Sequence, residues 1–504
     1  MTRANLAVAA QAIGDQDEVR TNLEISDRLF TGMPPRYRLE SQIPLANVEL
    51  SRGDASAALT RLEKLRQDLN PPPSVLIGAL YYSALGEAYR RNRMLPESIN
   101  AYRQAIAWGV ERVHSLQSER ERTGVLRTIE NSHRGLVATI LAASRDEAEA
   151  LRVWQSFRAL DALGDPRRTI PAASPVLWFL ESPDGFVAWL EQNDQVFFYR
   201  FDAPREAVSA LAARFQRECA DPSSDPRRLR QDARQLYRWM IEPIASRLAP
   251  QDSLTLELDG ALTSVPVQAL ISREGQYLGD RVPLLVSSGY AAHSQPPALG
   301  SATKALVIAT PDVAGESAAR FPPLPDSLKE AALVRDAFPN STVLEGRGAS
   351  IQELEARLPS ADIVHFAGHG YADSENGALL FAPRDSTGAD YELLRSTDLR
   401  RQDWSRCRLA VLSACATAAG ETHGAHNPDS LVRALTRAGA SRVAASLWNV
   451  DSTATTELMR AFYNSLASSQ SPSQALRIAQ TAVRRRAGWD HPYYWAGFQL
   501  YGTT

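Results

Sequence analysis

Two short apolar runs that end in small residues constrain the fold of this chain more than any other feature. Residues 362–366 (DIVHF) lead into a GHG turn that contains His369, and residues 409–412 (LAVL) lead into SAC, which ends at Cys415. Their length and branched side chains are typical of buried strands. Sites in parallel sheets form at the carboxyl ends of neighbouring strands, so we expect the histidine and the cysteine to meet there.

An imidazole and a thiol are the two components of a cysteine nucleophile with its general base. His369 precedes Cys415 by 46 residues, close to the interval of about 50 found in caspases. Because Gly370 carries no side chain, we expect its N–H group and that of Cys415 to hold an oxyanion. The alternative is an inert buried cysteine and a packed histidine in an α/β core. The glycines and small residues around both side chains favour the catalytic interpretation.

Further motifs follow in the same order. After GHG and SAC come ASLWNVD at 445–451 and HPYYWAGF at 491–498. Together they resemble the CHAT domain, a caspase-like cysteine protease module usually found behind tetratricopeptide repeats, from about Pro175 to the C-terminus. The resemblance implies an α/β caspase-like fold with a mostly parallel sheet flanked by helices. One departure is Ala416, because many relatives have Glu directly after the cysteine.

Three parts of the chain are expected. Helical periodicity covers residues 1–165, and the sequence Gly-Asp-Pro at 164–166 ends it. The resemblance assigns residues 166–300 to a noncatalytic, pseudo-caspase-like first half and residues 301–504 to the catalytic half. From residue 304 onwards, expected strands alternate with expected helices, which favours a parallel sheet covered on both faces.

The first part resembles an array of tetratricopeptide repeats. Small residues at Gly86, Ser98 and Ala105 fall where the two helices of such a repeat must touch. Weaker copies surround the Gly-Asp turns that begin at Gly53 and Gly14. Stacked repeats form a concave surface that can bind a partner. A generic helical bundle is the alternative, and in either case we expect a role in recognition or regulation, because the region contains no group of reactive residues.

The predicted reaction is hydrolysis of peptide bonds in a protein substrate. Cys415 attacks the scissile carbonyl, and His369 takes up the proton and returns it. Candidate substrate-pocket residues, taken from the resemblance to caspase-like enzymes or from proximity to the turn, are Asp312, Asp373, Ser413, Trp448 and Asp451. Acidic groups at 312 and 451 favour a basic side chain at the substrate position before the cleaved bond (P1). Asp451 is also placed to cap the helix expected from residue 452.

Composition excludes several other classes of function. The net charge is −3, which gives no electrostatic reason to expect a nucleic acid or an anionic membrane as partner. Three cysteines cannot build a disulfide framework and point to a reducing, cytoplasmic location. No cofactor and no metal are expected: His365 and His369 show metal-ligand spacing, but they lie on a strand and a glycine turn, and no Glu follows the first histidine.

Two interpretations of the whole chain remain open. A protease held latent until a protein or small-ligand activator engages the repeats is favoured, because an uncontrolled cytoplasmic protease is toxic. A noncatalytic scaffold that retains the protease fold is the alternative. The resemblance suggests prokaryotic defence or programmed cell death. The sequence defines neither the substrate, the activator, the oligomeric state nor any self-cleavage.

Overall fold

A computed structural model describes most of the chain. The described residues are 2–29, 34–69, 74–116, 119–161, 174–249, 253–287, 299–300, 302–311, 313, 315–322, 324–372, 377–383, 389–414 and 431–502. They form two compact units: a helical one up to residue 167, which also includes residues 182–184, and an α/β one made of the other residues. None of the described helices is both long and apolar enough to cross a bilayer.

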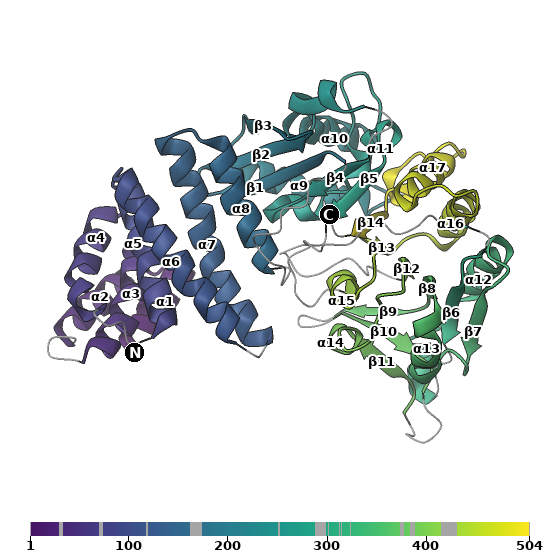
Figure 1. Ribbon diagram of the computed structural model, residues 1–504, viewed down its shortest axis with the longest axis horizontal. Helices are drawn as coiled ribbons and strands as arrows, with labels where there is room; N and C mark the ends of the chain where they lie inside the picture. Colours follow the sequence, from purple (N-terminus) through teal and green to yellow (C-terminus); the bar gives the residue numbers. More distant parts are fainter. Residues whose placement is uncertain are drawn as a thin grey trace. The chain divides into compact units, whose positions relative to one another are not determined.

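The helical unit is built from antiparallel helix pairs (Figure 1). Its helices are α1 (Thr2–Ile13), α2 (Gln16–Leu29), α3 (Pro35–Ser51), α4 (Ala55–Lys64), α5 (Val75–Arg91), α6 (Leu95–Ser115), α7 (Glu119–Ala143) and α8 (Glu147–Asp161), with a 3₁₀ turn η1 (Arg66–Leu69). The first helix of each pair packs against the first helix of the next, in the series α1, α3, α5 and α7. This stacking is the arrangement of tetratricopeptide-like repeats, as the sequence predicted.

A residue with positive φ lies in the turn inside each pair. These residues are Gly14 (φ 79°), Gly53 (φ 89°), Arg93 (φ 62°) and Arg145 (φ 54°). Left-handed backbone at the end of a helix reverses the chain and satisfies its last carbonyl groups. The two Gly-Asp turns seen in the sequence are therefore the first two members of a series of four.

Close contact between repeat helices depends on small residues around Tyr102. A Cβ atom at Gly86 would lie 2.7 Å from the Tyr102 ring, and one at Gly135 would lie 2.3 Å from it. The Tyr102 hydroxyl donates to Glu87 at 2.7 Å, and the buried Ser98 hydroxyl donates to the Gly86 carbonyl at 2.9 Å. The expected contact of small residues at Gly86 and Ser98 is confirmed.

The α/β unit is organised around one eleven-stranded sheet with the order β3-β2-β1-β4-β5-β14-β13-β12-β8-β6-β7. Its strands are β1 (Val176–Ser182), β2 (Gly185–Gln192), β3 (Gln195–Arg200), β4 (Leu254–Glu257), β5 (Leu284–Ser287), β6 (Ala305–Pro311), β7 (Thr342–Gly346), β8 (Ile363–Ala367), β12 (Leu409–Ser413), β13 (Arg442–Ser446) and β14 (Phe498–Gly502). A separate three-stranded sheet contains β9 (Gly370–Ala372), β10 (Gly377–Phe381) and β11 (Glu392–Arg395).

Nine strands of the large sheet form two parallel blocks, and the other two, β2 and β3, pair antiparallel at the edge beyond β1. Strands β1, β4, β5 and β14 run parallel to one another, and so do β13, β12, β8, β6 and β7. The blocks meet where β13 pairs antiparallel with β14. Strand β14, near the end of the chain, thus completes the block that begins with β1. Strands from before and after residue 300 therefore belong to the same sheet. The mostly parallel α/β architecture is the predicted one.

Helices cover the sheet, and the alternation of side chains along β8 identifies its two faces. Phe366 packs against Phe381 of the small sheet on one face, and His365 contacts α12 and α16 on the other. The helices of the unit are α9 (Arg205–Cys219), α10 (Pro226–Met240), α11 (Leu278–Arg281), α12 (Pro325–Ala337), α13 (Ile351–Arg357), α14 (Ser396–Leu399), α15 (Leu431–Arg437), α16 (Ser452–Ala467), α17 (Pro472–Arg484) and α18 (Pro492–Trp495).

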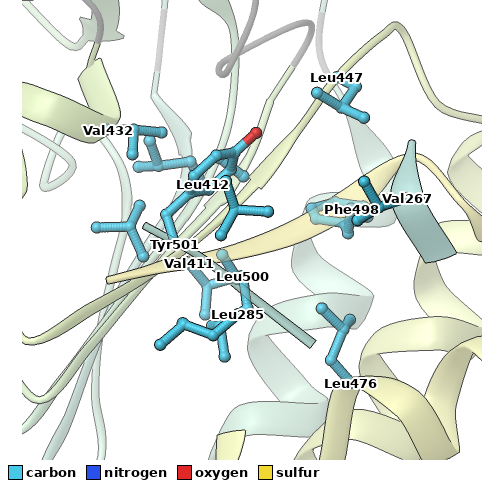
Figure 2. Close-up of a cluster of buried hydrophobic side chains, with 14 of the residues drawn as sticks. Val267, Leu285, Val411, Leu412, Val432, Leu447, Leu476, Phe498, Leu500 and Tyr501 are labelled. Carbon is cyan, nitrogen blue, oxygen red and sulfur yellow. The ribbon is translucent and has the colours of Figure 1, made fainter. Parts of the chain in front are cut away.

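One hydrophobic core joins the two blocks of strands. Figure 2 shows Leu285 of β5, Leu500 of β14 and Val411 of β12 gathered in it with Leu476 of α17. A buried amide also anchors β14 within its own block, because Gln499 donates to the carbonyl of Val265, which lies between β4 and β5, at 3.1 Å. Apolar burial and a satisfied polar group therefore both hold the last strand in place.

Candidate functional site

The two strands that precede His369 and Cys415, β8 and β12, are neighbours and end at the same level of the sheet. Ala367, the last residue of β8, is the register partner of Ser413, the last residue of β12. His369 and Cys415 each follow two residues later. In sequence order, the strands β7-β6-β8-β12-β13 form the arrangement 2-1-3-4-5, so the order reverses between β6 and β8. Ligands of open α/β sheets bind outside the carboxyl ends of strands at such a reversal.

His369 is held by a backbone group that follows β6. Its Nε2 atom lies 2.8 Å from the carbonyl oxygen of Pro322. A carbonyl oxygen only accepts, so Nε2 is the donor, and the neutral ring then has its lone pair on Nδ1. The Phe321 ring packs against the imidazole with centroids 5.4 Å apart, and Tyr391 packs edge-on against Phe321. The half-buried imidazole is thus oriented with a basic nitrogen on the side away from Pro322.

The N–H group of Gly370 has a direction set by the small sheet. Gly370 is paired with Leu379, and the neighbouring Leu380 N–H donates to the His369 carbonyl at 3.0 Å. Antiparallel pairs alternate between hydrogen-bonded and non-hydrogen-bonded ones. Because 369 and 380 form a hydrogen-bonded pair, 370 and 379 form the other kind. The Gly370 N–H therefore points away from β10.

The described part of β12 ends just before the predicted nucleophile. Ser413 is half-buried and Ala414 is buried. The carbonyl oxygen of Ala414 accepts a hydrogen bond of 2.7 Å from the hydroxyl of Ser446, the last residue of β13. Cys415 itself lies outside the described residues, as do the predicted pocket residues Asp312 and Asp373.

Two other predicted pocket residues have structural partners. Trp448 is buried, and its indole N–H donates to the carbonyl of Tyr493 at 3.2 Å. Asp451 is the N-cap of α16, since its carboxylate accepts from the Ala454 N–H at 2.8 Å. The structure thus shows the capping role that the sequence offered for Asp451, and a pocket role for either residue stays a prediction.

His365 lies in β8, four residues before His369, and its side chain is packed against two helices. It is fully buried, its Nδ1 atom is 2.7 Å from the Tyr463 hydroxyl, and its Nε2 atom is 3.2 Å from a Glu330 carboxylate oxygen. Burial and the Glu330 charge raise the pKa of Tyr463. These contacts attach β8 to α12 and α16. The expectation that His365 is a packed residue is confirmed, and its place beneath the site stays a prediction.

Two of these contacts, those of Pro322 and Ser446, were not predicted from the sequence. Pro322 acts through a backbone carbonyl, which any residue type supplies. Ser446 is one of many serines in the chain, and only the pairing of β12 with β13 brings its side chain to Ala414. A small polar residue at the end of an expected strand beside the nucleophile strand was the one available signal for Ser446.

Comparison with known proteins identifies two curated relatives that share a name. Tetratricopeptide repeat protein 28 of Mus musculus is 29% identical over 325 residues, which cover 54% of this chain and 13% of the relative. The Homo sapiens protein of the same name is 27% identical over 379 residues, which cover 64% and 15% respectively. The chain therefore spans only a small part of these relatives.

A solved structure shares the fold. The separase–securin complex from Saccharomyces cerevisiae, at 3.0 Å resolution, aligns with 99% of this chain and 49% of that one, with a TM-score of 0.52 and 10% identity. At this identity the likeness concerns the fold alone. It agrees with a caspase-like α/β unit preceded by helical repeats.

The family model described as the CHAT domain matches residues 230–503, more than half of the chain. The match contains the strand ends of β8 and β12, the residues 445–451 and the closing strand β14. The resemblance found in the sequence is thereby confirmed. The chain belongs to the CHAT domain family.

Proposed function

We propose that this chain is a cysteine endopeptidase that hydrolyses a protein substrate with Cys415 as nucleophile and His369 as base. The observation that carries the proposal is the register of Ala367 with Ser413, together with the imidazole held by Pro322. With Nε2 donating to that carbonyl, Nδ1 is the nitrogen left to take the thiol proton. Cys415 follows the last residue of β12 by two positions, and two residues of chain span at most about 7 Å.

The reaction proceeds in two halves. The Cys415 thiol gives its proton to His369 Nδ1 and attacks the scissile carbonyl carbon, whose oxygen takes up the electron pair. The N–H groups of Gly370 and Cys415 stabilise this oxyanion. His369 then returns the proton to the leaving amine as the peptide C–N bond breaks. Water, deprotonated by His369, finally hydrolyses the thioester and regenerates the thiol.

The substrate pocket is proposed from residues around these strand ends. Asp312, Asp373, Ser413, Trp448 and Asp451 are its candidate lining. An acidic floor formed by Asp312 or Asp451 selects basic P1 side chains. Ser413 is the described member closest in sequence to the nucleophile, and its half-buried side chain is consistent with a place at the edge of the pocket.

Latency is the second part of the proposal. The tetratricopeptide-like unit receives a protein or small-ligand activator in the cytoplasm, and the protease acts only then. Stacked repeats suit this role because they offer an extended binding surface. The separase of the solved structure is in complex with securin, which supports a protein partner for this fold. A role in prokaryotic defence or programmed cell death rests on the family resemblance.

A noncatalytic scaffold is the competing function. One observation favours it: the curated relatives are named for their repeats, and their name indicates no activity. The scaffold requires neither an oriented imidazole at 369 nor a thiol at 415. Chemical reactivity of Cys415 therefore separates the two functions.

Peptide acyloxymethyl ketones with Arg, Lys, Leu, Met or Asp at P1 provide the test. The full chain, Cys415→Ala, His369→Ala and the control Cys407→Ala are incubated with each probe, and intact mass is measured. We expect one adduct, absent from Cys415→Ala, slowed in His369→Ala and retained in Cys407→Ala. Absence of an adduct with every probe, also after addition of candidate activators, would favour the scaffold.

The other two cysteines are buried, so they should not react with the probes and obscure labelling of Cys415. Cys219 and Cys407 are fully buried free thiols. Burial raises the pKa of both thiols, that of Cys407 to about 12. A thiol reacts as its thiolate, so neither residue is expected to react in the folded chain at neutral pH. All three cysteines should react with iodoacetamide in urea.

A further inference from the structure

A hydrogen bond joins Ser446 to Ala414, the residue that precedes the proposed nucleophile in the sequence. Ser446 is fully buried at the end of β13, and its hydroxyl donates to the Ala414 carbonyl at 2.7 Å. Regular pairing of β12 with β13 runs from Ala410 with Val443 to Leu412 with Ala445. The serine side chain thus fixes the main chain where the regular ladder stops.

This carbonyl belongs to the same peptide group as the N–H of Cys415. A trans peptide unit is planar, and its C=O and N–H bonds point in opposite directions. Holding the Ala414 oxygen therefore also fixes the direction of the N–H that follows. A hydrogen bond to the carbonyl further polarises the amide and strengthens its N–H as a donor.

We propose that Ser446 is a positioning residue for the oxyanion: it orients and polarises the Cys415 N–H. The inference rests on the proposed function, because it requires Cys415 to be the nucleophile. The two oxyanion donors then have separate supports. The Gly370 N–H is directed by the β9–β10 pairing, and the Cys415 N–H is directed by the hydroxyl from β13.

A purely structural role for Ser446 predicts different results. Removal of the hydroxyl leaves a buried carbonyl without this donor, which lowers stability in either case. An oxyanion role adds an effect on steps that develop negative charge on the substrate oxygen. Alkylation of the thiol by iodoacetamide develops no such charge, so it reports thiol reactivity and access without the oxyanion site.

Four variants of the full chain make the test. Ser446→Thr and Ser446→Val have nearly the same shape and differ in the hydroxyl, so their comparison removes the steric effect of a larger buried side chain. Ser446→Ala removes the hydroxyl without added volume. Ser396→Ala is the control, because Ser396 is also fully buried and its hydroxyl has no hydrogen-bond partner among the described residues.

Four quantities are measured for each variant. They are kcat and KM for peptide cleavage, the inhibition constant of the matching peptide aldehyde, and the rate of iodoacetamide alkylation at Cys415. The peptide substrate and the aldehyde carry the P1 residue of the probe that labels the wild type. The aldehyde is informative because the thiol adds to it, and the resulting oxygen occupies the oxyanion site.

We expect kcat to fall about tenfold to a hundredfold in Ser446→Ala and Ser446→Val, since a small misplacement of a reacting group has effects of this size. Aldehyde binding should weaken by a similar factor. KM and the alkylation rate should stay within about threefold of wild type, which is a smaller change than the expected fall in kcat. Ser446→Thr should recover most of the loss, and Ser396→Ala should match wild type.

Two results overturn the inference alone. One is wild-type kcat and aldehyde binding in Ser446→Val; the other is a parallel fall of alkylation and kcat, which indicates general disruption. If Ser446→Ala does not fold, the Thr and Val pair decides. Failure of wild-type Cys415 to react with any probe overturns the proposed function, and this inference with it.

Discussion

The Nε2 atom of His369 lies 2.8 Å from the carbonyl oxygen of Pro322, 47 residues earlier in the chain. Because the partner is a backbone group, the side chains beside it determine how firmly it is held. Phe321 packs on the imidazole and Tyr391 packs on Phe321. The aromatic pair is therefore the part of this arrangement that mutation can change.

Replacing Phe321 with Ala should loosen the imidazole. We expect kcat to fall roughly tenfold or more, because misplaced reacting groups lose rate steeply, while KM changes little. Lys329→Ala is the control, since this exposed lysine lies on α12, the helix that follows the same loop. An unchanged kcat in Phe321→Ala would show that the Pro322 contact is sufficient by itself.

Asp451 allows its capping role to be separated from a pocket role. Asp451→Ala removes the cap of α16 and should lower the free energy of unfolding by about 1 kcal/mol. Asp451→Asn keeps a good capping side chain but removes the charge, so we expect stability close to wild type. The decisive measurement is kcat/KM with Arg and Leu at P1 in the Asn variant.

A selective loss of kcat/KM for the Arg substrate in Asp451→Asn would support an acidic pocket at this position. Equal kcat/KM values for both variants and wild type would leave Asp451 with its cap alone. The Ala variant adds the stability reference, because thermal unfolding shows whether the cap was removed as intended. The carboxylate accepts the Ala454 N–H in the structure, so a change in melting temperature is expected only for Ala.

The strand pattern of the sequence predicted much of this fold because each strand is locally apolar. Residues 304–310, 362–366 and 409–412 all became strands of the large sheet near their expected bounds. The adjacency of β8 and β12 followed from the α/β pattern. The position of β14 between β5 and β13 did not, because the identity of a paired neighbour depends on long-range contacts and not on local periodicity.

The candidate site was predictable in part for a similar reason. His369, Cys415 and Gly370 stand out as side-chain types and turn residues in the sequence. Pro322 contributes a backbone oxygen, and the small sheet that directs the Gly370 N–H depends on short strands separated by irregular segments. Backbone donors and acceptors carry no sequence signature, so their places are known only after the fold is.

The helical unit should be sensitive to one added methyl group. Gly86→Ala places a Cβ atom 2.7 Å from the buried Tyr102 ring, and such overpacking typically costs about 1–3 kcal/mol of stability. Gly124→Ala is the matched control: this exposed glycine of α7 has open space around its Cβ position. There alanine should stabilise the helix by about 1 kcal/mol through its higher helix propensity.

Hydrogen exchange of α5 and α6 peptides in the full chain measures both effects. Faster exchange in Gly86→Ala, with unchanged exchange in the α/β unit, is the expected result. Equal exchange rates in Gly86→Ala and wild type would mean that the Tyr102 ring moves aside without loss of packing. Gly124→Ala should slow exchange in α7.

Acid should weaken the helical unit through His133. This residue is fully buried in α7, its Nδ1 atom is 2.7 Å from the Ile129 carbonyl, and burial lowers its pKa from 6.5 to about 4. Between these two pH values the unfolded chain binds a proton that the folded chain does not. The free energy of unfolding therefore falls as the pH falls from 6.5 towards 4, by up to about 3 kcal/mol in total.

His133→Gln removes the titrating group, so the pH dependence of α7 stability should become shallower over this range. The measurement is hydrogen exchange of α7 peptides at pH 7, 6 and 5, corrected for the intrinsic exchange rate. His114→Gln, at an exposed histidine of α6, is the control and should keep the wild-type slope. Since the folded chain excludes the proton only while the His133 ring stays buried, equal slopes in wild type and His133→Gln would show that the ring reaches water at acid pH.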